Sequence, residues 1–282
     1  RIADATQQLL KAGRMAAAAE ARLLEAGAAR ALAACARSEG RDEEAFTWLN
    51  QARRALEHGG TLTDLVGVLR ELAEVEGQRG RVVEAVRLHR RRAELLQASD
   101  DAAGAARALV DLGVLLEAQG CVDEALELLT ASVRFARRAG DVRGEARGLL
   151  AAGRLFLLRD DLTTALIDLE AAAFLARDAG WTAGLAASLW RISRIERRIG
   201  QLAASLMHAR EATALAEPLD AAGHFEVRVN LVEALEAFGQ RGVAIVEAQS
   251  LLDGLSDGGR ASRVRSLLAS WGAEANHLVR AT

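Results

Sequence analysis

One stretch decides the fold of this 282-residue chain: Ala108-Leu109-Val110-Asp111-Leu112-Gly113-Val114-Leu115-Leu116-Glu117-Ala118-Gln119-Gly120-Cys121-Val122-Asp123-Glu124-Ala125. Before Gly120, apolar residues recur at the i, i+3 and i+4 spacing that puts them on one face of a helix, and the spacing resumes after it. Glycine readily adopts the positive φ that ends a helix, so Gly120 marks a tight turn. The stretch therefore predicts two amphipathic helices joined by a short turn.

The same pattern returns every 40 residues. Glycine stands at positions 40, 80, 120 and 200, with Asp160 at the remaining position. Small residues stand at 45, 85, 125, 165 and 205, and leucine stands at 9, 49, 129 and 169, with His89 and Ala209 as exceptions. A helix pair cannot bury its apolar stripe alone, whereas stacked pairs share a continuous core. The period predicts an all-α solenoid of helix–turn–helix repeats.

The stretch 108–125 resembles a tetratricopeptide repeat in its Leu112-Gly113 pair, its turn residue Gly120 and the small residue Ala125 that opens the packing face of the second helix. The period of about 40 residues is similar to the longer bacterial subtype found in sensor regions of signalling ATPases, kinases and transcriptional activators. The resemblance covers about residues 1–255. It departs from the 34-residue form in lacking the terminal proline and the first-helix aromatic residue. It implies a right-handed superhelical α-solenoid that binds peptides or proteins along its concave face.

We expect one solenoid over residues 1–282, opened by a half repeat at 1–19 and closed by a capping helix at 259–282. Residues 2–17 have the register of a second helix, which favours a fragment of a longer protein over a native N-terminal capping helix. Six full repeats are expected in between: 20–60, 61–100, 101–140, 141–180, 181–220 and 221–258.

Composition and motifs favour a chain without chemistry of its own. Lys and Arg number 36 against 39 Asp and Glu, a net charge of −3 that excludes the broadly basic footprint of a nucleic-acid-binding protein. The sequence has no Gly-Lys-Ser/Thr phosphate loop and no His-Glu-x-x-His metal motif. We also expect no Gly-x-Ser-x-Gly nucleophile elbow. The expectation is no enzyme, no cofactor, no metal, no membrane partner and a cytoplasmic location.

Several reactive-looking residues have simpler interpretations. Asp100-Asp101 and Asp160-Asp161 fall at helix junctions, where an aspartate caps the following helix. We expect His89 to be a half-buried packing residue rather than a pH sensor, and both cysteines, Cys35 and Cys121, to be small buried hydrophobes. The run Arg87, Arg90, Arg91 and Arg92 is expected on a solvated outer face rather than on nucleic acid.

The candidate site follows from the positions that face the groove in tetratricopeptide repeats. Arg154, Arg194 and Arg197 would lie on adjoining inner faces beside an aromatic shelf, Trp190, and arginine matches carboxylates and phosphates with two hydrogen bonds. The sixth copy would be acidic there. The alternative is that long arginine side chains solvate an alanine-rich surface. The candidate ligand-binding residues are Arg147, Arg154, Trp190, Arg191, Arg194, Arg197, Val110, Val114 and Leu150.

These observations favour a non-catalytic scaffold or sensor that recognises an acidic segment of a protein or peptide, or the effector domain of its own chain. One alternative is a small-molecule sensor in which an anionic ligand controls an N-terminal ATPase or kinase. A second alternative is a homo-oligomerisation scaffold.

Overall fold

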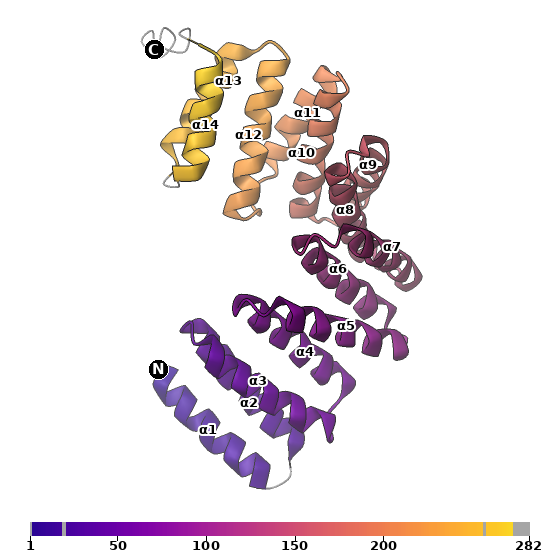
Figure 1. Cartoon of the computed structure of the whole chain (residues 1–282), viewed down its shortest axis with the longest axis vertical. Coiled ribbons are helices and arrows are strands. Elements are labelled where there is room, and N and C mark those ends of the chain that lie inside the picture. Colours follow the sequence, from indigo (N-terminus) through magenta and orange to yellow (C-terminus); the bar gives the residue numbers. More distant parts are fainter. Residues whose placement is uncertain (1, 19–20, 256–257, 273–282) are drawn as a thin grey trace. The chain divides into compact units, whose positions relative to one another are not determined.

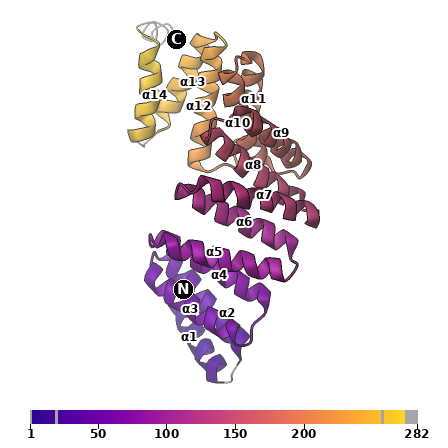
Figure 2. The ribbon, with the colours of Figure 1, turned by 45° about the vertical axis from the view of Figure 1, so that its right-hand side comes forward.

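Helices make up the architecture of the described part of this chain. The computed structural model describes residues 2–18, 21–255 and 258–272, and within these ranges every regular element is an α-helix. The helices gather into two compact units, residues 1–140 and 141–282. In both units, consecutive helices lie side by side (Figures 1 and 2). The predicted all-α helical-repeat fold is confirmed.

The first unit contains seven helices within its described residues. They are α1 (Ile2–Ala18), α2 (Arg22–Ser38), α3 (Asp42–Glu57), α4 (Leu62–Gln78), α5 (Val82–Ala98), α6 (Ala102–Ala118) and α7 (Val122–Ala139). Three or four residues separate each helix from the next between α2 and α7. Connections that short make neighbouring helices antiparallel.

The second unit continues the pattern. Its described helices are α8 (Val142–Leu158), α9 (Leu162–Asp178), α10 (Thr182–Arg198), α11 (Leu202–Ala214), α12 (Ala221–Ala237), α13 (Arg241–Asp253) and α14 (Gly258–Ser270). With 13 residues, α11 is shorter than α9, which has 17. The proline at position 218 stands where the last residue of a 17-residue α11 would lie, and proline disfavours a helical residue before it.

Junction residues fix the helix boundaries. Asp101, Asp141 and Asp161 each accept a hydrogen bond from the backbone N–H three residues later, at 2.8, 2.8 and 3.1 Å, which satisfies one of the free donors at a helix start. Asp100 and Asp160 adopt the left-handed conformation, with φ of 60° and 62°, where other copies have glycine. Capping is thus confirmed for one aspartate of each predicted pair.

Small residues let the two helices of a copy approach closely. A Cβ atom added to Gly153 would lie 2.8 Å from Cγ of Leu169 and 3.3 Å from the carbonyl oxygen of Ala165. Ala125 of α7 and Ala165 of α9 open the second helix of their copies, and both are completely buried. Larger side chains at these positions would overpack the core.

At its C-terminal end the second unit is covered by α14. Val264 is buried in a cluster with Phe225 of α12 and Leu251 of α13. The predicted capping helix extended over 259–282, of which 273–282 lie outside the described residues. Residues 1, 19 and 20 of the predicted half repeat and its junction also lie outside them. The grouping of all copies into one right-handed superhelix stays a prediction.

Candidate functional site

Arginine is concentrated on two neighbouring helices of the second unit. Helix α8 has three arginines and one glutamate, and α10 has four arginines and one glutamate. The two helices contact one another, and Leu150 of α8 packs against the apolar cluster that contains Trp190 of α10. We call Arg147, Arg154, Arg191 and Arg194 the α8/α10 arginine face; of the other three arginines, Arg143 lies over the ring of Trp181, Arg197 pairs with Glu233 and Arg198 pairs with Asp160.

Trp190 lies beneath the guanidinium groups of two arginines of this face. Its side chain is only 7% exposed. The guanidinium carbons of Arg191 and Arg194 lie 4.2 and 5.4 Å from the centre of the ring, within cation–π range. The expected aromatic shelf is therefore wrong, because the ring belongs to the core and arginines cover it. A partner would meet the guanidinium groups, and the indole would hold them in place.

Arg197 is already occupied. Its guanidinium donates to Oδ1 of Asn230 at 3.0 Å and to Glu233 of α12 at 2.5 Å. Burial lowers the pKa of Arg197, and the nearby carboxylate of Glu233 opposes that shift. The expectation that Arg197 faces an incoming anion is therefore corrected. Arg197 joins α10 to α12, the first helix of the following copy. Counting along one helix could not reveal an acid supplied 36 residues later.

The remaining arginines of the candidate set line the arginine face to different degrees. Arg194 is exposed, whereas Arg147, Arg154 and Arg191 are half-buried. Arg191 also donates to the carbonyl oxygen of Ala187 at 2.6 Å. These four arginines are the part of the candidate set that remains on α8 and α10 after Arg197 has been assigned to Glu233.

The apolar part of the candidate set is divided. Val110 and Val114 lie on α6 in the first unit, where Val110 is buried and Val114 is exposed. Leu150 is half-buried on α8 in the second unit. The structure therefore does not bring the predicted apolar residues together within one unit.

The acidic sixth copy is also neutralised by neighbours. Arg263 of α14 bonds to Glu226 at 2.7 Å and lies 3.8 Å from Glu233, which also accepts from Arg197. The charge segregation inferred from the sequence is thus reduced at its acidic end.

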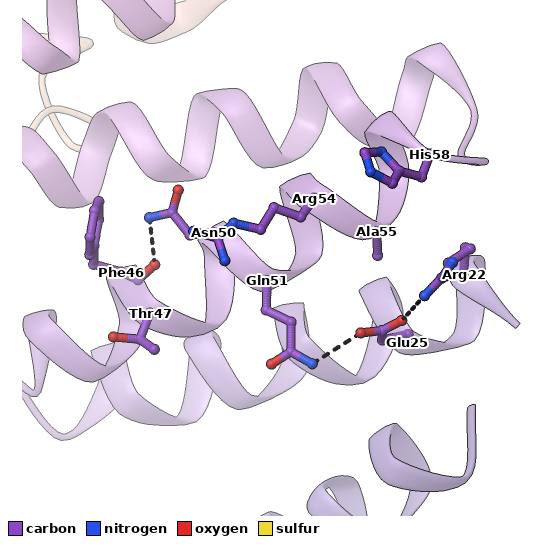
Figure 3. A pocket seen from close by; sticks show the side chains of 9 residues that line it. All are labelled: Arg22, Glu25, Phe46, Thr47, Asn50, Gln51, Arg54, Ala55 and His58. Carbon is purple, nitrogen blue, oxygen red and sulfur yellow. Dashed lines mark hydrogen bonds and ion pairs between the residues drawn. The ribbon is translucent and has the colours of Figure 1, made fainter. Parts of the chain in front are cut away.

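A polar pocket lies along α3 in the first unit (Figure 3). It has a volume of about 660 Å³. Gln51 of α3 and Arg22 of α2 both point at the carboxylate of Glu25, at 3.1 and 3.3 Å. Sequence reasoning missed this pocket, because its polar residues pair across two helices and form no motif.

Three expectations about reactive residues need correction. Cys35 is half-buried and Cys121 exposed, because Cys121 is the residue before α7 rather than part of its apolar face. Arg87, Arg90 and Arg91 are exposed as expected, but Arg92 is buried. His89 is only 8% exposed, so it is buried rather than half-buried as expected.

The spacing of a nucleophile elbow does occur in the sequence, contrary to expectation, as Gly254-Leu255-Ser256-Asp257-Gly258. A nucleophile elbow places its serine between a strand and a helix. Here α13 precedes the motif, and Ser256 and Asp257 lie outside the described residues.

Within residues 2–18, 21–255 and 258–272, no group of three or more His, Cys, Asp or Glu side chains could hold a metal ion. Among the described helices, none combines the length and apolar character needed to cross a membrane.

Comparison with known proteins identifies the fold. No protein-family model and no curated protein matches this sequence. Solved structures do match. BtubC (BKLC) from P. vanneervenii is 16% identical with a TM-score of 0.57, over 95% of this chain and 91% of that chain. RapI in its apo form is 11% identical with a TM-score of 0.67, over 92% of this chain and 76% of that chain.

A third match is a signal transduction ATPase with numerous domains (STAND) with a tetratricopeptide repeat sensor, from Pyrococcus horikoshii. It is 13% identical with a TM-score of 0.70, over 82% of this chain and 36% of that chain. At such identities the likeness concerns the fold alone. This chain has the tetratricopeptide-type helical-repeat fold.

Proposed function

We propose that this chain is a non-catalytic binding scaffold whose α8/α10 arginine face takes an acidic segment of a protein or peptide. The observation that carries the proposal is the excess of arginine on two adjacent helices, seven against two glutamates; of the seven arginines, Arg197 and Arg198 pair with Glu233 and Asp160 outside these helices. One of these glutamates, Glu196, is buried and lies 2.8 Å from Nδ1 of His208. It offers little compensation to an arginine at the surface.

Carboxylates suit this surface. Guanidinium groups bind them with paired, charge-assisted hydrogen bonds. Arg194 is exposed and stacked on Trp190, so less side-chain entropy is lost when it binds. A Rap protein with a similar fold, 13% identical with a TM-score of 0.58, was solved in complex with competence and sporulation factor. That complex supports the use of this fold for binding.

The test is a fluorescence anisotropy titration of a fluorescein-labelled decapeptide of Asp, Glu and Gly. The wild-type chain should bind it, and Arg154→Glu with Arg194→Glu should weaken binding about 100-fold, since two charge-assisted contacts are replaced by repulsion. The matched control is Arg87→Glu with Arg91→Glu, which makes the same charge change on the exposed face of α5.

The control should retain affinity within about threefold, because screening weakens charges at a distance. Equal losses in both double variants would show that only net charge matters, and an unchanged α8/α10 variant would place the site elsewhere. Circular dichroism melts check that both variants remain helical.

The two alternatives stay open to separate tests. A sensor for an anionic small molecule, coupled to an ATPase or kinase, would respond to anionic metabolites rather than to the acidic peptide in a thermal-shift screen. A homo-oligomerisation scaffold would scatter light with the mass of a dimer or larger assembly. We also propose that the chain is cytoplasmic and that the acidic segment can belong to an effector domain of the same chain.

A further inference from the structure

The second copy departs from the others at two core positions of its second helix. The position occupied by Leu49, Leu129 and Leu169 is His89 in this copy. Three residues later the departure is larger. Arg92 stands where the other copies have alanine or serine, all of them buried: Ala52, Ser132, Ala172 and Ala212.

Both departures leave polar atoms buried. Arg92 is 6% exposed, and its Nη1 donates to Oδ2 of Asp111 on α6 at 2.6 Å. Arg92 Nε and His89 Nδ1 are buried without a hydrogen-bond partner within the described residues. Buried polar atoms without partners cost stability, and an unoccupied ligand or ion site is one accepted explanation for them.

A cavity lies beside Arg92. It has a volume of about 350 Å³, is partly open to solvent and is lined by residues of α4, α5 and α6, all in the first unit. Arg92 is its buried basic group, while Arg70 of α4 and Arg107 of α6 are exposed at its edge. Thr63 and Ser99 add hydroxyl groups to the wall.

The cavity favours an anion. Three of its lining residues are arginines and one, Asp101, is acidic. The carboxylate of Asp101 already accepts the N–H of Gly104 at 2.8 Å. Arg70 has a distant partner, Glu74 at 3.6 Å on the same helix. Burial lowers the pKa of His89, which lies one helical turn before Arg92 outside the cavity lining, so its ring adds no charge near pH 7.

We propose that this cavity binds a small anion with a phosphate or carboxylate group, which accepts from Arg92 Nε while Arg70 and Arg107 flank it. The volume is at the small end of ligand pockets, so it suits a metabolite of few atoms rather than a peptide. The site is independent of the acidic-segment surface on α8 and α10.

The test is isothermal titration calorimetry of the full chain with inorganic phosphate and, separately, with succinate. Saturable one-to-one binding of either probe supports the proposal, and the probe that binds assigns the phosphate or the carboxylate class. Arg92→Ala should weaken binding about tenfold or more, as expected when a charged hydrogen-bond partner is lost. Alanine occupies this position in three other copies, so the variant should fold.

The matched control is Arg91→Ala, which removes the same charge from an exposed neighbour on α5. It should bind like the wild type. Absence of binding for both probes, or equal weakening by the two variants, would overturn the proposal. Phosphate also stabilises proteins by exclusion from their surface, so direct heats of binding are the measurement rather than melting temperature. Retained peptide binding by Arg92→Ala would keep the two sites distinct.

Discussion

Two helix pairs, α2 with α4 and α8 with α10, use arginine in partly different ways. On α2 and α4, Arg30 bonds to Glu71 at 2.5 Å and Arg37 to Glu74 at 3.2 Å, so each guanidinium meets an acid from the next copy. On α10, Arg197 meets Glu233 of the next copy in the same way, whereas Arg194 is exposed and stacks on the buried ring of Trp190. An arginine on these helices can therefore join neighbouring copies, as Arg30 and Arg197 do, or lie exposed on an aromatic ring, as Arg194 does.

The largest expected effect concerns the base of the arginine face. Trp190→Ala should lower the free energy of unfolding by about 3–5 kcal/mol, because it removes a buried aromatic side chain from the core. Urea denaturation of the full chain measures this loss. Phe174→Ala on α9, where the side chain is 70% exposed, should change stability by less than about 0.5 kcal/mol. Similar values for the two variants would contradict a buried indole.

Charge reversal at Arg30 of α2 and, separately, at Arg194 of α10 sharpens the comparison of the two helix pairs. Arg30→Glu should cost about 1 kcal/mol of stability, because it breaks a double hydrogen bond on a partly exposed side chain and faces Glu71 with a like charge. It should leave binding of the acidic peptide unchanged. Arg194→Glu should cost about 0.5 kcal/mol, the value of an exposed cation–π contact, and should weaken peptide binding. The comparison fails if Arg30→Glu weakens peptide binding as much as Arg194→Glu.

A smaller effect compares the buried His89 of α5 with Leu129, which occupies the equivalent position on α7. His89→Leu should raise stability by about 1 kcal/mol at pH 7, because it removes a buried polar atom without a partner. The gain should grow as the pH falls below about 6.5.

The sign follows from the linkage of folding to protonation. Burial is the main cause that lowers the folded-state pKa of His89; Arg92 and Arg70 lower it further, while Asp111 and Glu74 oppose the shift. Between that pKa and about 6.5 the unfolded chain binds the extra proton, so acid favours unfolding. Denaturation at pH 7 and pH 5 measures the difference. Leu129→His on α7 should create the same pH dependence, and a pH-independent difference in both variants would refute it.

Spacing along the chain was enough to predict the fold. The columns of Ala125 and Leu129, the turn at Gly120 and the capping residues Asp101 and Asp161 all follow from local rules, and the helices confirm them. These features depend on residues within one helix pair.

The candidate site was predictable only in part, because its state depends on adjacent helices. The sequence placed Arg194 and Trp190 one turn apart on a helix, and the guanidinium carbon of Arg194 lies 5.4 Å from the centre of the Trp190 ring. It could not show that Trp190 is buried or that Glu233 takes Arg197, since both result from packing against other helices. The sequence did contain a sign of the cavity, because Arg92 stands at a repeat position where the other copies have alanine or serine.

The most direct test of the account is to locate a bound acidic peptide. A decapeptide of Asp, Glu and Gly with one photoreactive benzoylphenylalanine can be crosslinked to the wild-type chain and mapped by mass spectrometry. We expect crosslinks on α8 and α10 that disappear in Arg154→Glu with Arg194→Glu. Crosslinks on α2 and α4, or spread evenly over exposed arginines such as Arg87 and Arg91, would contradict the α8/α10 arginine face as the binding surface.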